Sequence, residues 1–112
     1  MRDKRVSARA PLDIYLNKYI SGVPYLAHAS DISRNGVALS HLIEPELESQ
    51  RVGLQFQLPG SEEVIYAEGE VVREWVEAGE SRDERSGVRF TLLTQRHRRL
   101  IDDYVTRSTQ AH

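Results

Sequence analysis

The sequence contains no cysteine, and this absence excludes several kinds of site at once. Disulfide scaffolds, thiolate metal sites and cysteine nucleophiles all need the sulfur atom that the chain lacks. A cysteine-free chain suits a reducing compartment, and we expect a cytoplasmic location. The N-terminal residues Met-Arg-Asp-Lys-Arg are followed by no apolar stretch, so we expect no signal peptide.

Long apolar runs and an excess of positive charge are also missing. No run approaches the length of roughly 18 apolar residues that a membrane-spanning helix needs, so we expect no membrane insertion. Lysine and arginine together number 15 against 17 aspartates and glutamates, which gives a net charge of −2. A barrel that binds single-stranded nucleic acid needs a basic groove with several exposed aromatic side chains. With one tryptophan and two phenylalanines, the chain is not expected to bind DNA or RNA.

Recognisable catalytic and metal-binding motifs are absent as well. The histidines show no spacing typical of a metal site; they are His28, His41, His97 and His112. Ser33 has no G-x-S-x-G frame, and the chain has neither a P-loop nor a G-x-G-x-x-G motif. We therefore expect no catalytic residue, no metal and no cofactor, and we do not expect an enzyme.

What the sequence does contain is a period of two along most of its length. At 112 residues it is long enough for one compact domain. Alternation of apolar and polar residues predicts strands over residues 12–17, 23–28, 37–42, 52–58, 64–76 and 88–92. The Ser21-Gly22 pair predicts a turn, and residues 31–36, 44–50 and 78–86 are predicted to be turns or loops. Short strands separated by turn signals predict a small antiparallel barrel or sandwich.

After the last predicted strand the period changes from two to that of a helix. Leu100, Ile101, Tyr104 and Val105 fall on one face of a helix, and Thr94 is suited to be its N-cap. A helix with one apolar face must bury it, so we expect it to cover an open end or a flank of the barrel. The predicted fold is therefore all-β with one C-terminal helix.

Two polar segments stand out from this framework. The first carries four cations, Arg2, Lys4, Arg5 and Arg9, in a chain that is acidic overall, and so makes a local positive site. Charge runs of this kind are usually solvated tails, and a solvated tail is the alternative interpretation of this segment taken alone. The second segment, residues 31–36 (DISRNG), consists largely of residues that turns prefer. It also offers a carboxylate, a hydroxyl and a glycine to which a ligand could come close.

Taken together, the two segments resemble the paired signature of one family. Arg5-x-x-x-Arg9, followed one hairpin later by Asp31-x-Ser33-x-x-Gly36, is similar to the motifs of the PilZ domain, a receptor for the bacterial second messenger cyclic di-GMP. The resemblance extends through residues 70–73, residues 86–90 and the C-terminal helix, and so covers nearly the whole chain. The family fold is a six-stranded antiparallel β-barrel with a C-terminal helix, which agrees with the strands predicted above.

The resemblance implies a role for each of these five residues. It assigns Arg5 and Arg9 to guanine edges and phosphates, because the guanidinium fork matches both geometries. Asp31 would accept hydrogen bonds from guanine N1–H and N2–H₂, and Ser33 would bond to the base or a phosphate. Gly36 would allow a close approach that a Cβ atom would block.

Three further positions are possible ligand contacts in the same interpretation. Lys4 stands where many members of the family carry another arginine, and this position is thought to influence whether one ligand or a stacked pair is bound. Trp75 could stack on a guanine, although its place on the same strand face as Val71 fits a core role equally well. Arg73 shares that face, and a plain surface role is the alternative for it.

The functional expectation is a stand-alone cyclic di-GMP receptor with two parts. Residues 1–10 would form a flexible ligand-binding arm, with both arginines ahead of the first strand, and residues 11–107 the barrel with its helix. Ligand binding would order the arm and alter contacts with an unidentified effector protein, in motility, exopolysaccharide or biofilm control. The alternative is a PilZ-like adaptor that binds proteins and no nucleotide.

Overall fold

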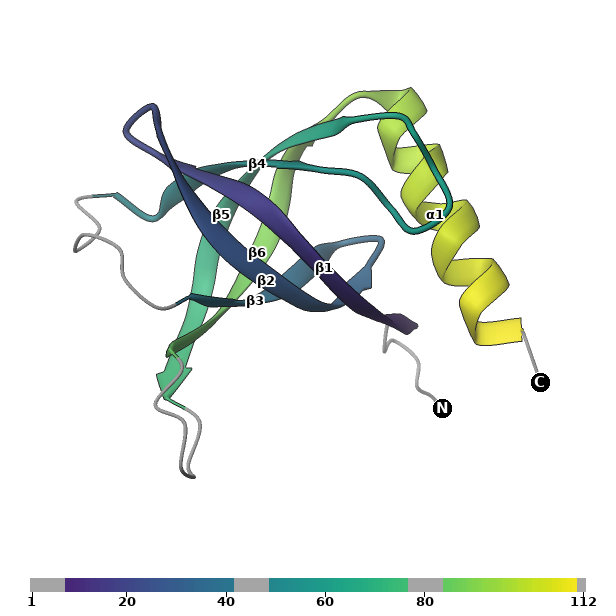
Figure 1. The fold of residues 1–112 in the computed structure, drawn as a ribbon, viewed down its shortest axis with the longest axis horizontal. Coiled ribbons are helices and arrows are strands. Elements are labelled where there is room, and N and C mark those ends of the chain that lie inside the picture. The colour runs from purple at the N-terminus through teal and green to yellow at the C-terminus, as the bar shows by residue number, and fades with distance from the viewer. Residues whose placement is uncertain (1–7, 42–48, 77–83, 111–112) are drawn as a thin grey trace.

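The computed structural model describes residues 8–41, 49–76 and 84–110, which form a closed six-stranded barrel and one helix (Figure 1). The strands are β1 (Arg9–Ile20), β2 (Val23–Ser33), β3 (Gly36–His41), β4 (Arg51–Phe56), β5 (Ile65–Val76) and β6 (Glu84–Leu93), and the helix is α1 (Gln95–Gln110). Around the barrel the order is β1, β2, β3, β6, β5, β4, and every pairing is antiparallel. The predicted antiparallel barrel with a C-terminal helix is confirmed.

The period of two in the sequence sends alternate side chains into the barrel. In β1, Leu12, Leu16 and Ile20 are buried, whereas Tyr15 is exposed. Lys18 follows the same alternation and lies fully inside, with 0% of its surface exposed. A buried cation needs an interaction partner, and Lys18 has one. The apolar pattern of the sequence did not identify this inward-facing lysine.

The first strand begins earlier than the sequence predicts. β1 starts at Arg9 rather than after Pro11, because Arg9 pairs with Ser33 at the end of β2. The prediction placed both motif arginines before the first strand, and this is corrected for Arg9, which belongs to the barrel. Arg5 and the rest of residues 1–7 lie outside the described part of the chain.

The polar segment at residues 31–36 is also less of a loop than predicted. Asp31 and Ser33 belong to β2, and Gly36 opens β3, which leaves a bend at Arg34 and Asn35. The strand pairing continues almost to the tip of the hairpin, so Asp31 and Ser33 are held by the hydrogen bonds of the sheet. The sequence suggested a turn because these residue types prefer turns.

The predicted loop over residues 78–86 overlaps the start of the last strand. β6 begins at Glu84, and Ser86 is buried and pairs with Leu39 of β3. Each strand of a closed barrel has two neighbours, and β6 lies between β3 and β5. Backbone hydrogen bonds to both neighbours extend the strand into a segment that has no large apolar side chains. Residues 77–83 of this predicted loop, and all but residues 49 and 50 of the loop predicted at 44–50, lie outside the described residues.

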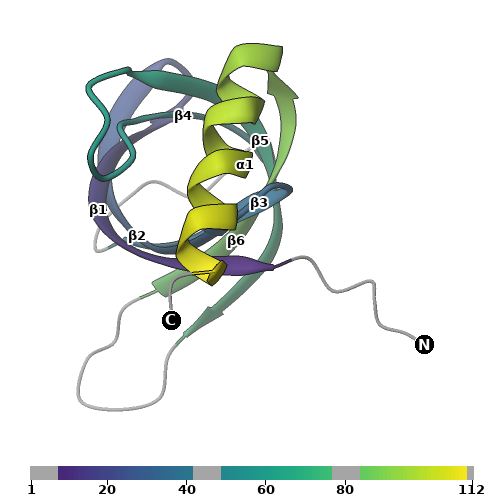
Figure 2. The same cartoon turned by 90° about the vertical axis from the view of Figure 1, so that its right-hand side faces the viewer.

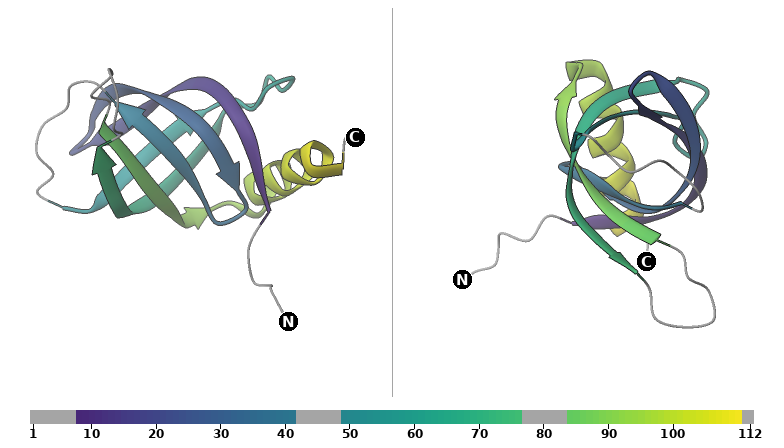
Figure 3. Two further views of the ribbon diagram at one scale, coloured as in Figure 1. Left: turned by 90° about the horizontal axis from the view of Figure 1, so that it is seen from below. Right: turned by 90° about the vertical axis from the view of Figure 1, so that its left-hand side faces the viewer.

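Helix α1 covers one end of the barrel, as Figures 2 and 3 show. Ile101 and Val105 are buried in the barrel core, and Leu100 and Tyr104 pack against it, which confirms the predicted apolar face. The Tyr104 hydroxyl donates a hydrogen bond to the carbonyl oxygen of Pro11 in β1, at 3.0 Å. Within the described ranges, no helix combines the length and the apolar character needed to span a membrane.

The N-terminus of α1 is held by a cap and by a carboxylate from the chain between β4 and β5. The backbone N–H of His97 donates to Thr94 Oγ1 at 3.1 Å, which confirms the predicted N-cap. Arg96 donates through Nε and Nη2 to the two carboxylate oxygens of Glu63, both at 2.6 Å. This hydrogen bonding to Arg96 lowers the pKa of Glu63 below its ordinary value of 4.5.

The lowered pKa of Glu63 predicts how the stability of the barrel depends on pH. Because the folded state favours the ionised carboxylate, its contribution is present above pH 4.5 and is lost as the pH falls through the folded-state pKa. We expect Glu63→Gln to be less stable than the wild type at neutral pH and equally stable well below pH 4.5. Thermal denaturation across this range measures the difference. The control is Glu62→Gln, since the neighbouring Glu62 makes no ion pair in the described structure, and an identical pH profile in both variants would contradict the prediction.

Candidate functional site

The candidate site is built around a contact between the two motif segments. The start of β1 lies beside the end of β2, as the left view of Figure 3 shows, with Arg9 paired to Ser33 and Pro11 to Asp31. Arg9 Nε donates a hydrogen bond to Asp31 Oδ1 at 2.7 Å, although the two residues are 22 positions apart. Both side chains are partly exposed, 48% for Arg9 and 36% for Asp31. The barrel therefore brings one arginine of the first motif together with the aspartate of the second.

Ser33, in contrast, is turned into the structure of its own hairpin. Its hydroxyl accepts a hydrogen bond from the backbone N–H of Asn35 at 3.2 Å and lies 3.5 Å from the carbonyl oxygen of Gly36. The Asn35 carbonyl in turn accepts from the backbone N–H of Phe90 in β6, at 2.8 Å. Ser33 is 1% exposed, and its side-chain contacts shape the turn, which the Asn35 carbonyl fastens to β6.

Gly36 is needed by the barrel itself. A Cβ atom at this position would lie 2.3 Å from the carbonyl oxygen of Val88 and 3.3 Å from the Cα atom of Arg89. Both are backbone atoms of β6, which pairs with β3 here, so neither can move aside alone. The family resemblance assigned Gly36 to the approach of a ligand, and the structure shows that β6 already makes a close approach of this kind.

Arg9 and Asp31 lie at a groove of about 450 Å³ between the β2–β3 hairpin and the facing parts of β5 and β6. Ser33 and Gly36 also line this groove, so it contains four of the five motif residues that the resemblance assigned to the ligand. Its ionisable lining residues are three arginines, Arg9, Arg73 and Arg89, and one carboxylate, Asp31. In a chain of net charge −2, this groove is a local positive site.

Arg73 reaches the groove through an irregularity in β5. A β-bulge separates Val71, which pairs with Val88, from Arg73, which pairs with Gly87. Val71 is buried whereas Arg73 is exposed, so the expectation that the two share a strand face is wrong. The bulge shifts the alternation by one residue, which a strict period of two in the sequence does not predict.

Arg89 is a residue of the groove that the sequence analysis did not single out. It pairs with Gly36 in the register of β3 and β6, and its Nη2 donates to Glu70 Oε1 at 2.9 Å. The alternation around it carries the missing signal, because buried Val88 and Phe90 flank it and so direct its side chain outward. Only the pairing of β6 with β3 places that outward side chain beside the motif residues.

Three of the predicted contacts remain outside the described structure. Lys4 and Arg5 belong to residues 1–7, and the side chain of Trp75 is also outside it, although its backbone pairs with Arg85 in β5 and β6. Arg34, in the middle of the second motif, forms an ion pair with Asp102 of α1 (3.3 Å) and does not line the groove. That pair fastens the hairpin to the helix.

Comparison with known proteins assigns the family. The model of the PilZ domain matches residues 3–107, nearly the whole sequence, and this chain therefore belongs to the PilZ domain family. The PilZ domain is a non-catalytic receptor or adaptor fold. No curated protein is similar enough in sequence to count as a match.

Solved structures share the same fold at low sequence identity. The inhibitor of motility of Bacillus subtilis (MotI/DgrA) aligns with a TM-score of 0.75 and 16% identity, over 96% of this chain and 52% of that chain. The PilZ domain of YcgR from Escherichia coli, solved with c-di-GMP, aligns with a TM-score of 0.70 and 12% identity, over 96% and 93% of the two chains. The PlzA protein of Borreliella burgdorferi, in complex with c-di-GMP, aligns with a TM-score of 0.63 and 16% identity, over 92% of this chain and 41% of that chain. The chain thus spans about half the length of the Bacillus subtilis protein.

Proposed function

We propose that the groove beside the β2–β3 hairpin binds cyclic di-GMP and that the protein is a receptor for this second messenger. The observation that carries the proposal is the hydrogen bond between Arg9 and Asp31, which joins the two motifs at the edge of a positively charged groove. A volume of about 450 Å³ is in the range of small-molecule sites. Membership of the PilZ family, two of whose structures hold c-di-GMP, supports the same ligand.

The chemistry of the groove suits a ligand with two guanines and two phosphodiester charges. An arginine fork matches the adjacent O6 and N7 acceptors of guanine, which we assign to Arg9. The Asp31 carboxylate is suited to accept from guanine N1–H and N2–H₂. Arg73 and Arg89, from β5 and β6, are suited to bind the phosphates, Arg89 in exchange for its ion pair with Glu70.

Exchanging the ion pair between Arg9 and Asp31 for contacts with the ligand would cost little free energy. A salt bridge between partly exposed side chains contributes about 0–1 kcal/mol to stability. A bidentate contact between arginine and guanine is worth roughly 1–3 kcal/mol of discrimination against another base. The ion pair would therefore keep both side chains at the groove until the nucleotide replaces it.

The N-terminal segment would complete the site in this proposal. Arg5 would supply the second fork, and Lys4, one position before it, would influence the number of ligand molecules bound. Ordering of residues 1–8 against the ligand would change the surface that the protein presents to an effector protein. Motility, exopolysaccharide or biofilm machinery is the kind of partner that we propose.

The proposed function predicts that cyclic di-GMP stabilises the folded protein. At a ligand concentration of 100 times the Kd, linkage gives about 2.7 kcal/mol, which corresponds to a rise in Tm of roughly 10 °C for a chain of this size. Differential scanning fluorimetry measures the shift, and titration calorimetry gives the affinity and stoichiometry.

Cyclic di-AMP is the matched control ligand, because it has the same phosphate ring but lacks the guanine O6 acceptor. Equal shifts with both nucleotides would contradict recognition of guanine by Arg9. An unchanged Tm and no heat with cyclic di-GMP would exclude the receptor and leave the adaptor that binds no nucleotide.

A further inference from the structure

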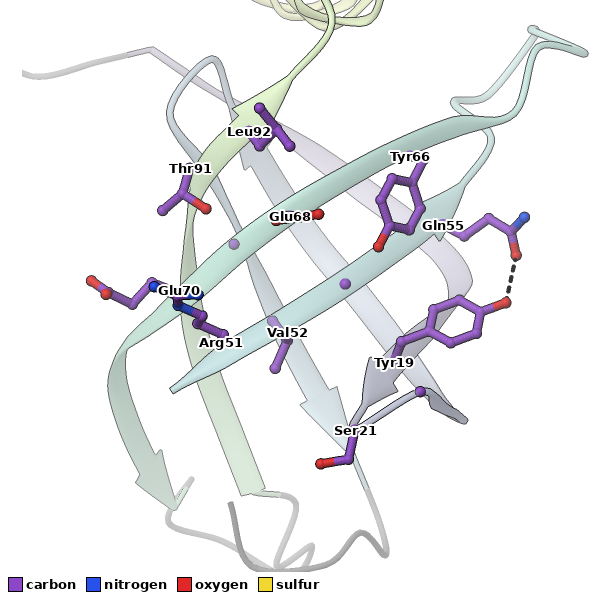
Figure 4. Close-up of a pocket in the computed structure, with 13 residues that line it drawn as sticks. Tyr19, Ser21, Arg51, Val52, Gln55, Tyr66, Glu68, Glu70, Thr91 and Leu92 are labelled. Atoms are coloured by element: carbon purple, nitrogen blue, oxygen red, sulfur yellow. Dashed lines mark hydrogen bonds between the residues drawn. The ribbon is translucent and has the colours of Figure 1, made fainter. Parts of the chain in front are cut away.

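Arg9 and Arg89 of the groove each hold a carboxylate, and the two carboxylates differ in position. Arg9 bonds to Asp31, which lines the groove itself. Arg89 donates through Nη2 to Glu70 Oε1 at 2.9 Å, and Glu70 does not line the groove. Glu70 lines a separate pocket of about 740 Å³, over β1, β4, β5 and β6 (Figure 4). Any contribution of Glu70 to the groove must therefore act through Arg89.

The strand register places Glu70 between two arginines. It pairs with Arg89 of β6 on one side and with Arg51 of β4 on the other. Directly opposite residues of antiparallel strands have Cβ atoms about 4.5–5.5 Å apart, so both guanidinium groups can reach the carboxylate. Among the residues that the structure describes, Glu70 bonds to Arg89 alone and Arg51 makes no ion pair. Arg51 is therefore available to Glu70 when Arg89 turns away.

The ion pair changes what an anion meets in the groove. Glu70 offsets the positive charge of Arg89, so an incoming phosphate meets a neutral pair rather than a free cation. The two side chains are 56% exposed for Arg89 and 43% for Glu70. A pair with this exposure is weak, and a phosphate can replace the carboxylate.

We propose that Glu70 is a positioning residue that lowers the affinity of the groove for phosphate groups by competing for Arg89. The identity of the ligand rests on the proposed function, whereas the competition concerns any anion at Arg89. Without ligand, the ion pair holds the Arg89 side chain toward β5. Binding replaces Glu70 by a phosphate oxygen, and Arg51 is the cation that remains beside the released carboxylate.

The test is titration calorimetry of the full chain with cyclic di-GMP at low ionic strength, where exposed charges are screened least. We expect Glu70→Gln to bind about fivefold more tightly than the wild type. A merely structural role of Glu70 would not raise the affinity. Glu68→Gln is the matched control, since Glu68 is exposed on the same strand, does not line the groove and makes no hydrogen bond or ion pair with the described residues. Equal affinities of the two variants would overturn the proposal.

Arg89→Ala tests whether the effect acts through this arginine. In that background, Glu70→Gln should change the affinity no more than Glu68→Gln does. A fivefold gain that persists without Arg89 would contradict the proposed competition.

Pyrophosphate separates this inference from the receptor function, because it offers phosphate oxygens without a guanine. Followed by NMR at the Arg89 amide of the ¹⁵N-labelled chain, it should bind Glu70→Gln more tightly than Glu68→Gln. This difference without any heat from cyclic di-GMP would mean that the receptor function alone fails. Binding of cyclic di-GMP by the wild type, with equal affinities of the two variants, would mean that the inference about Glu70 alone fails. No response to either probe would overturn both.

Discussion

Replacing Arg9 by alanine is expected to weaken binding of cyclic di-GMP about 30-fold or more. Truncation removes a charged fork from guanine or phosphate acceptors, which costs roughly 2 kcal/mol or more, and every 1.4 kcal/mol is a factor of ten in Kd. The expected effect on stability is small, because the ion pair with Asp31 is partly exposed. Titration calorimetry measures the affinity, and thermal denaturation of the free protein measures stability.

The matched control is Arg99→Ala, which removes a cation from the exposed face of α1. It lowers the net charge equally, so a general electrostatic contribution of the protein to affinity would appear in both variants. We expect the control to bind as the wild type does. Equal affinities of Arg9→Ala and wild type would withdraw Arg9 from the site, and a large loss of stability in Arg9→Ala would show that the ion pair mainly supports the fold.

Substituting Gly36 by alanine is expected to lower the free energy of unfolding by roughly 2–3 kcal/mol, more than Arg9→Ala or Gly53→Ala. The added methyl group would lie 2.3 Å from the Val88 carbonyl oxygen, so β3 and β6 must separate or distort to admit it. Because Gly36 lies beside Asp31 and Ser33 in the groove, the same distortion should weaken nucleotide binding. Urea denaturation gives the free energy of unfolding, and calorimetry gives the Kd.

Gly53→Ala provides the comparison for this substitution. Its Cβ atom would also come close to a neighbour, but that neighbour is the Tyr66 hydroxyl, the far end of a side chain that can turn away. We expect a change of less than about 1 kcal/mol in the free energy of unfolding. Similar decreases in the free energy of unfolding for Gly36→Ala and Gly53→Ala would contradict the prediction that the backbone contact at Gly36 is the more destabilising one.

The residues of the second motif, Asp31, Ser33 and Gly36, have different structural roles. Ser33 and Gly36 have contacts within the fold, with the turn and with β6, whereas Asp31 has its bond to Arg9 and borders the groove. The second motif therefore contains residues that shape the hairpin as well as a residue that borders the groove. Variants of the first kind are expected to change stability and binding together, and variants of the second kind binding alone.

Much of the fold could be predicted from the sequence because its signals are local. Alternation of apolar residues marked β4 and β5, and the spacing of Ile101 and Val105 marked the buried face of α1. The Ser21-Gly22 turn was predicted from residue type, and both residues have positive φ, 52° and 81°. These properties depend on a few neighbouring residues, so a single sequence is sufficient to identify them.

The site was predicted only in part, because its geometry depends on pairing between distant strands. The motifs named Arg9 and Asp31, but the register of β1 with β2 decides that their side chains meet. Arg89 and Arg73 join the groove through the register of β6 with β3 and through a bulge in β5. Neither feature has a signal in the spacing of residues along one strand.

What this sequence determined by itself is the set of its elements, the inward and outward faces of most strands, and the two motifs that indicate the family. Tertiary structure alone decided that Arg9 belongs to β1, that Lys18 is enclosed, and that Arg89 lies beside the motif residues. The physical reason is that side-chain alternation follows from the local backbone geometry. Register and closure are set instead by hydrogen bonds between strands that are far apart in the chain.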